Sequence, residues 1–459
     1  MAQLISVTMT LTNEGFMTMA SFFESELSKS LLVLAMAGTL AACGGSDNNS
    51  DNDADDHNDE EHHDDEHAHT GGRLIYSVSD DSGLNMYDQT AEEADAFSTD
   101  VVTTSATGAT LVLAKNGLTA AMLDNGAVSI VDAGLEHLAE EDGHTHDVSS
   151  EPTTLTSGIT KVVATHEYFS AFDGMGSTLI DAEDGTVVTA PTSDAYPTLA
   201  LTGGHFLTFM DGIDGATDLE VVEANGDSLV TPVTLNCASG GITASAQTEH
   251  LTQVLCGNGT LLTLIAEDGE TETAFYPDSD AESGFDNLTA TFSENDVIAA
   301  WNSETGALTL TKAHGDHPHS TDMSENISSD AILAVAAPSD EDTEVVGILG
   351  TDGVFTALFY AAEDHSVAFV SKDTFVIDSE VTWAAGDALL AGSTAFLAAN
   401  TGNNALYYMD AHDGSDYHVH GSAISNEDLG NIASAVFAHP QEAHEHDHDE
   451  EDGESDHDH

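Results

Sequence analysis

Basic residues are nearly absent from this 459-residue chain. Six Lys or Arg stand against 83 Asp or Glu, so the formal net charge is -77 with histidine neutral. A nucleic-acid partner is excluded because a polyanion needs a basic surface, which six cations cannot make. Anionic lipid surfaces are excluded for the same reason. Because salt screens self-repulsion of this size, the acidity indicates a salt-rich habitat and not an activity.

Long apolar runs are also scarce, and one of them has a targeting pattern. Lys29 precedes the apolar run 31–37, and the small residues after it end in LAAC, whose cysteine is Cys43. This order predicts a secretion signal over 1–43. LAAC resembles the lipobox of bacterial lipoproteins, in which the cysteine is lipidated. The run is too short to cross a bilayer comfortably. We therefore expect a periplasmic protein held to a membrane, the outer membrane, only by a lipid anchor.

Cysteine is rare, with three in the chain. Once Cys43 is assigned to the anchor, Cys237 and Cys256 remain in an oxidising compartment. A structural disulfide between neighbouring strands is the default there. A zinc-thiolate site is the other interpretation, and the lack of a CxxC spacing disfavours it.

Two segments have almost no apolar residues. Residues 44–72 hold 11 acids and 5 histidines, and residues 439–459 hold 10 acids and 6 histidines. Neither can bury enough surface to offset its ordering entropy, so we expect disordered tails on either side of one domain at 73–438. Histidine-rich tracts indicate metal binding, because imidazole is the commonest protein metal ligand. His67 and His69 are expected ligands in the first tract. The alternative is low-complexity drift.

The stretch 73–438 repeats about every 40 residues and shows no helix-period stripe. Each unit reads as four short strands with Gly-Asx turns, as in 109–134 and 159–188. Period and strand number predict an all-β domain folded as a β-propeller. The first unit lacks an opening strand, and 431–440 reads as an opening strand without followers. We therefore expect the C-terminal strand to close the ring, which gives eight blades, with seven as the alternative.

Histidine recurs at one position of the repeat. In a propeller the innermost strand of each blade lines the channel, and the turn after it opens at one end. His166, His205 and His250 occupy this turn in three units, and His439 follows the closing strand. Up to four imidazoles are therefore expected to converge, although each alone is also compatible with a turn residue in solvent. The aspartates of the next turn, such as Asp173, read as structural D-G turn residues.

Closely spaced histidines mark three excursions that the repeat pattern places between blades: 141–147, 314–319 and 412–420. They contain the pair His144 and His146 and the pair His418 and His420. An HxH pair in an extended segment puts both rings on one side, close enough to share an ion. Zinc takes about four N or O ligands, and HxH with an aspartate supplies three. Imidazoles favour Zn²⁺ over calcium or magnesium, with copper and nickel still open.

The His/Asp segment after a secretion signal, the blade VVATHEYFSAFDGMGSTLIDAEDG and the HxH segments resemble the AztD family of periplasmic zinc metallochaperones. That resemblance implies a β-propeller that binds zinc and delivers it to the solute-binding protein of a zinc ABC transporter. It also implies His144, His146, His166 and Asp173 as ligands, and the tract 57–69 as a mobile loading segment. The chain departs from the family in its lipobox, its second histidine-rich tail, its cysteine pair and its acidity.

Catalytic motifs are missing: the sequence has no GxSxG elbow, HExxH helix or Walker loop. We therefore expect a protein that is not an enzyme. A metal-dependent propeller enzyme and a non-catalytic surface scaffold lipoprotein stay open as alternatives, because propellers host many activities.

Overall fold

The computed structural model describes residues 72–89, 91, 96–135, 146–212, 216–237, 240–265, 274–277, 284–290, 297–314, 317–338, 344–363, 366–392, 394–411, 416–420, 423–425, 429 and 431–439. All of them belong to the second of two compact units, 1–67 and 68–459. Several predicted features lie outside the described residues: the signal with Cys43, the tract up to residue 71 with His67 and His69, His144, and the tail after His439. In the part of the chain that is described, no helix is long and apolar enough to cross a membrane.

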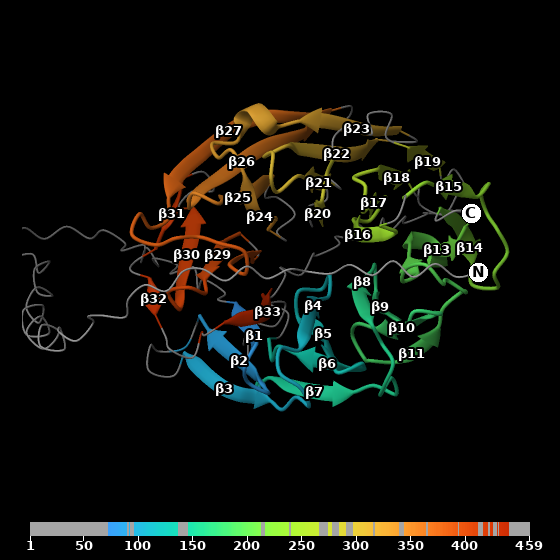
Figure 1. The fold of residues 1–459 in the computed structure, drawn as a ribbon, viewed down its shortest axis with the longest axis horizontal. Coiled ribbons are helices and arrows are strands. Elements are labelled where there is room, and N and C mark those ends of the chain that lie inside the picture. The colour runs from blue at the N-terminus through green and yellow to red at the C-terminus, as the bar shows by residue number, and fades with distance from the viewer. Residues whose placement is uncertain are drawn as a thin grey trace, which may run out of the picture. The chain divides into compact units, whose positions relative to one another are not determined.

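Eight antiparallel sheets form the blades of a ring (Figure 1). This confirms the predicted all-β, eight-bladed propeller. Blades are numbered here along the chain, and their strands are given from the innermost outward.

Blade 1 consists of β33 (Ile432–Ala438), β1 (Arg73–Val78), β2 (Leu84–Asp88) and β3 (Phe97–Val102). Blade 2 consists of β4 (Thr110–Leu113), β5 (Thr119–Asp124), β6 (Ala127–Asp132) and β7 (Ser149–Pro152). Blade 3 consists of β8 (Lys161–Ala164), β9 (Tyr168–Phe172), β10 (Ser177–Asp181) and β11 (Val187–Thr189). Blade 4 consists of β12 (Leu199–Ala200), β13 (His205–Asp211), β14 (Thr217–Glu223) and β15 (Val233–Leu235).

Blade 5 consists of β16 (Ile242–Gln247), β17 (Leu251–Cys256), β18 (Leu261–Ile265) and β19 (Ala274–Pro277). Blade 6 consists of β20 (Asn287–Ala290), β21 (Val297–Trp301), β22 (Leu308–His314) and β23 (His317–Asp322). Blade 7 consists of β24 (Ile332–Ala336), β25 (Val345–Gly350), β26 (Val354–Glu363) and β27 (Ser366–Val376). Blade 8 consists of β28 (Ala388–Ala391), β29 (Phe396–Asn400), β30 (Ala405–Ala411) and β31 (Tyr417–Val419), with β32 (Ile424–Ser425) beside β30. Two 3₁₀ turns are η1 (Thr202–Gly204) and η3 (Ser324–Asn326).

The C-terminal strand closes the ring, as the repeat pattern predicts. β33 pairs antiparallel with β1, with Arg73 opposite Ala438 and Leu74 opposite Phe437. β33 also contacts β4 and β28, the inner strands of the two neighbouring blades (Figure 1). Blade 1 is therefore built from both ends of the domain, and removal of either end would open the ring.

Apolar packing between blades supplies the core. Strands in the middle of a blade read as continuous apolar runs because neighbouring blades cover both of their faces. β21 (VIAAW) and β25 (VVGILG) are buried along their whole length. Between blades 2 and 3, Ile130 packs with Phe169 and Ile180 in one cluster. Burial of each such side chain stabilises the fold by about 1.5–3 kcal/mol.

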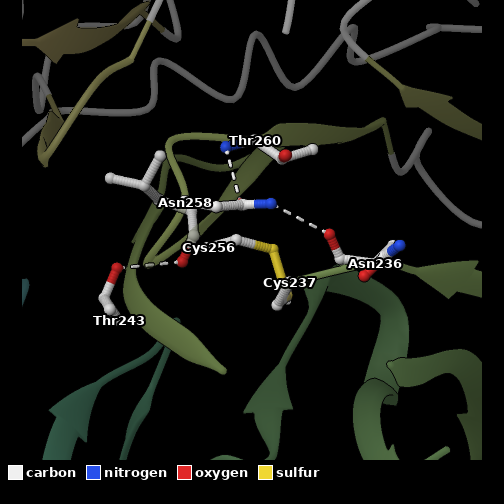
Figure 2. Close-up of a disulfide and its surroundings, with 7 residues drawn as sticks. Asn236, Cys237, Thr243, Cys256, Asn258 and Thr260 are labelled. Atoms are coloured by element: carbon white, nitrogen blue, oxygen red, sulfur yellow. Dashed lines mark hydrogen bonds between the residues drawn. A yellow bond between two sulfur atoms is a disulfide. The ribbon is translucent and has the colours of Figure 1, made fainter. Parts of the chain in front are cut away.

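A disulfide joins Cys237 and Cys256, with their Cα atoms 4.9 Å apart (Figure 2). Cys237 follows the outermost strand of blade 4, and Cys256 ends the second strand of blade 5. Beside it, Asn258 Nδ2 donates to the Asn236 carbonyl at 3.1 Å, which adds a second link between the two blades. The two sulfurs therefore hold adjacent blades together.

Candidate metal-binding face

Equivalent turns of neighbouring blades meet at one end of the ring. Thr202 Oγ1, in the turn after β12, donates to the Glu249 carbonyl in the turn after β16 at 3.3 Å. The backbone N–H of His439, after β33, donates to the Gly117 carbonyl in the turn after β4 at 3.0 Å. Strands alternate in direction outward from these turns, so third-to-fourth-strand connections share the same end. We call this end the histidine face, defined by the turns 114–118, 165–167, 201–204 and 248–250.

Within the described ranges, histidine gathers at this face. The ten histidines of the described residues all lie in its connections or within four residues of one: His146, His166, His205, His250, His314, His317, His319, His418, His420 and His439. The connections between second and third strands, at the opposite end, contain no histidine, among them 79–83, 125–126, 173–176, 257–260 and 401–404. One end of the propeller therefore gathers imidazoles among carboxylates.

The three histidine-rich excursions lie within blades, which corrects the prediction that they lie between them. They connect the third strand of a blade to the fourth: 141–147 in blade 2, 314–319 in blade 6 and 412–420 in blade 8. The fourth strands of blades 2 and 8, β7 (SSEP) and β31 (YHV), are short and polar, so the sequence does not show where they begin. The strand ends that flank each excursion therefore belong to the histidine face.

A cavity of about 190 Å³ lies between blades 3 and 4 at this face. His166 and Glu167 line it from the turn after β8, and Phe206 lines it from β13. Gly203 also lines it, with a φ of 72° that favours glycine. A Cβ at Gly203 would lie 3.7 Å from Cε1 of His205, so the His205 ring packs beside the turn that borders the cavity.

The charge state of His166 suits metal binding. Burial lowers the pKa of His166 below its ordinary value of 6.5, and the nearby Lys115 and His250 lower this pKa further. Glu167 and Glu249 act in the opposite direction and are outweighed. The His166 imidazole is therefore neutral at pH 7, the form that ligates a metal.

The inner-turn histidines divide into two groups. His166, His205 and His250 lie in the equivalent turns of three successive blades, as predicted. His439 lies in blade 1, is 3% exposed, and packs against blade 2, where a Cβ at Gly117 would lie 3.2 Å from its Cε1. In the described residues, no three His, Cys, Asp or Glu side chains are already grouped closely enough to hold an ion. Ligation at the inner turns therefore requires side-chain movement.

Asp173 is not brought together with His166. It follows β9, whereas His166 precedes β9, so the two lie at opposite ends of that strand, about 20 Å apart at roughly 3.3 Å per residue. Asp173 Oδ1 accepts the backbone N–H groups of Met175 and Gly176, both at 2.8 Å, and so closes its own turn. These contacts fit the structural interpretation of this D-G turn, and the separation means that Asp173 and His166 do not form one site in this structure.

Of the two predicted ligand pairs with HxH spacing, the structure describes one in full and one in part. His146 is exposed, and its carbonyl accepts from Arg73 Nη1 at 2.6 Å, while His144 lies outside the described residues. The rings of His418 and His420 lie with centroids 4.5 Å apart and planes inclined by 31°. This pair has the close spacing that an extended HxH segment predicts.

Two acidic residues at the inner turns were missed by sequence reasoning. Glu167 follows His166 directly, and Glu249 precedes His250 directly, so both carboxylates reach the same turns as the imidazoles. The adjacent His-Glu and Glu-His pairs were the available signal. Among 83 acids such pairs do not stand out until the fold aligns the turns.

No protein-family model and no curated protein matches this sequence. Among solved structures, apo AztD from Citrobacter koseri matches at 14% identity and a TM-score of 0.59, over 80% of this chain and 98% of that chain. A second crystal structure of Citrobacter koseri AztD matches at 13% identity and a TM-score of 0.59, over 82% of this chain and 100% of that chain. The chain has the fold of AztD. A periplasmic gluconolactonase from Pseudomonas aeruginosa, PpgL, matches at 13% identity over 80% of this chain and 99% of that chain, with a TM-score of only 0.41.

Proposed function

We propose that this protein binds Zn²⁺ on its histidine face and delivers it to the solute-binding protein of a zinc ABC transporter. The observation that carries this proposal is the segregation of every described histidine to one end of an AztD-like propeller. A packing role would distribute histidine over both ends, whereas metal exchange requires ligands that neighbour one another. The proposed role is non-catalytic.

The donor set fits a borderline divalent ion. Neutral imidazole at His166, with carboxylates of Glu167 and Glu249 nearby, offers the N and O ligands that zinc takes. A hard ion such as calcium or magnesium would need oxygen ligands and leave the imidazoles unexplained. We therefore propose zinc, with copper and nickel as the competitors that metal analysis would detect.

Both histidine-rich segments join the domain at this same face. Gly72, which ends the tract 44–72, precedes β1, and His439, which begins the C-terminal segment, follows β33. Arg73 and Ala438 are direct cross-strand partners, so the two attachment points are adjacent. Closely spaced histidines on a tethered segment allow stepwise ligand exchange, in which the ion is never released to solvent. Residues 57–69 can span up to about 40 Å, enough to reach across a propeller face.

We further propose that the protein acts in the periplasm, anchored to the outer membrane through Cys43. The lipobox-like sequence before Cys43 supports this location. Cells fed labelled palmitate should label the protein, and Cys43→Ala should abolish the label. Labelling of the Cys43→Ala variant would remove the anchor from the proposal.

Transfer kinetics test the function. Zinc-loaded full-length protein is mixed with an apo solute-binding protein of a zinc transporter, and separately with a chelator that reports spontaneous release. We expect zinc to reach the acceptor faster than it reaches the chelator. The matched control replaces the histidines of 57–69 with Gln, which keeps length and acidity, and should slow transfer to the rate of release. Transfer that never exceeds release in the unmodified protein would refute delivery and leave a zinc buffer or a metalloenzyme.

A further inference from the structure

A second group of metal-ligating side chains lies on blade 8, between its two outer strands. In the β30–β31 pair, Asp410 is directly opposite His418. The backbone N–H of His420 donates to the Tyr408 carbonyl at 2.9 Å, which continues the same register. Residues opposite one another in an antiparallel pair project from the same face, and so do residues two apart. Asp410, Tyr408, His418 and His420 therefore share one face of the blade.

Contacts among these side chains bring them together. The His418 and His420 rings are 4.5 Å apart, and the Tyr408 ring lies 5.9 Å from that of His420. The side chains of Asp410 and Gln89 both lie close to the Tyr408 hydroxyl. His418 Nδ1 lies 2.9 Å from the Asp416 carbonyl. Because a carbonyl only accepts, Nδ1 carries the proton, and Nε2 keeps the lone pair that a metal binds.

We propose that Asp410, His418 and His420 form a binding site for a borderline divalent cation, with Tyr408 as the residue that positions the carboxylate. Two imidazoles and one carboxylate are a set that zinc accepts, with a fourth position open to water or an incoming ligand. The Tyr408 hydroxyl beside Asp410 and the Asp416 carbonyl at His418 Nδ1 are outer partners of the kind that ligands of a metal site need. The three side chains must still close around the ion, since no such group is already assembled in the described residues.

Blade 6 offers a natural contrast. His317 and His319 have the same HxH spacing in the fourth strand of that blade, at the same face of the ring. The residue opposite His319 is Lys312, whose Nζ donates to the Ala362 carbonyl at 2.8 Å. An ammonium group on the partner strand repels a cation where the carboxylate of Asp410 attracts one. The two hairpins therefore predict opposite behaviour from the same histidine spacing.

The blade 8 site also lies beside the root of the N-terminal tract. Gln89 lies close to the Tyr408 hydroxyl, and its Oε1 accepts the Gly72 N–H at 3.2 Å. The Gln89 N–H in turn donates to the Gly72 carbonyl at 3.1 Å. One residue thus joins the site to the point where the tract enters the domain. This inference rests on the proposed function, within which the blade 8 site is the first binding site in the folded domain for an ion exchanged with the tract.

Histidine footprinting of the full-length protein tests the site. Zinc alone is titrated in, diethyl pyrocarbonate is added, and modification of each histidine is read from peptide masses. We expect His418 and His420 to be protected at low zinc and His317 and His319 to stay reactive. Asp410→Asn removes the charge of a ligand, and Tyr408→Phe removes an outer partner of that ligand. Each should raise the zinc concentration for half-protection by at least about tenfold. Circular dichroism melting should stay unchanged, which separates a ligand role from a structural one.

The outcomes separate this site from the proposed function. Protection of His418 and His420 that persists unchanged in Asp410→Asn would overturn the site, and so would equal protection of His317 and His319. Protection confined to His166, His205 and His250 with normal transfer would overturn the site and leave the proposed function standing. Absence of protection at every histidine, together with absence of transfer, would overturn both.

Discussion

Arg73→Met removes the buried cation that ties the closing blade to its neighbour. Arg73 is 5% exposed, and its Nε lies 2.8 Å from Asp88 Oδ2. Its Nη1 donates to the carbonyls of Ala133, Gly134 and His146 at 2.8, 3.1 and 2.6 Å. Blade 1 is thereby fixed to both ends of the connection between β6 and β7 of blade 2. The variant leaves the buried Asp88 carboxylate without a counter-charge and the three carbonyls without this donor.

The expected loss is large. Removal of one partner from a buried ion pair destabilises by about 3–5 kcal/mol, because an uncompensated charge stays in a poorly solvated site. A domain is stable by only about 5–15 kcal/mol, so this change is a substantial part of the total. Asp88→Asn in the Arg73→Met background should recover part of the lost stability, since it removes the buried negative charge that no longer has Arg73 beside it. A matched control is Lys372→Met: Lys372 Nζ also donates to a backbone carbonyl, that of Asn326 at 2.8 Å, but Lys372 is exposed. It should cost less than about 1 kcal/mol.

Urea unfolding at fixed high salt, followed by circular dichroism, measures the three variants against the unmodified protein. High salt screens the self-repulsion of the acidic chain, so the differences report the local contacts. If Arg73→Met loses no more stability than Lys372→Met, the buried link does not hold the ring closed and the reasoning is refuted.

Three further predictions concern closure, acidity and the disulfide. Deletion of 431–459 should unfold the ring because it removes β33, whereas deletion of 441–459 should leave the melting curve unchanged; identical melting of both truncations would contradict closure by β33. The pKa of His166 is lowered, so zinc held through His166 should stay bound until the pH falls below the ordinary value of 6.5, whereas exposed imidazoles should release zinc at higher pH. Zinc titrations from pH 7 to pH 5 compare the His166→Gln variant with the unmodified protein. Equal loss of zinc in both would contradict this prediction. Replacement of Cys237 and Cys256 by Ser should lower the free energy of unfolding by about 3 kcal/mol, the loop-closure entropy for their separation of 19 residues, and unfolding without reductant measures it.

Much of the fold could be predicted because propeller blades repeat their chemistry. Buried middle strands such as β21 (VIAAW) and glycine turns recur at a readable period, and the unpaired last strand marks the closure. The bounds of the outer strands could not be predicted, because one face of each meets solvent and selects no apolar pattern. β7, with the sequence SSEP, is exposed throughout. The histidine excursions were consequently assigned between blades.

The residue types of the candidate site could be predicted from the sequence, but which of those residues lie together could be predicted only in part. His166, His205 and His250 were found because equivalent turns follow the inner strand. Asp173, which the family resemblance implied as a ligand together with His166, lies at the other end of the same strand, a separation that its D-G motif does not reveal. The place of Asp410 opposite His418 could not be predicted, because it depends on the register of β30 and β31, which no local pattern in the sequence fixes.

The location of bound zinc is the most direct test of whether the histidine face holds the metal. Crystals of the full-length protein soaked in zinc would be measured by anomalous diffraction above and below the zinc absorption edge. We expect every strong zinc peak on the histidine face, at the turns 165–167 and 248–250 or beside Asp410. A strong peak at the opposite end, such as the acidic turn at Asp173, with none among the histidines, would contradict it.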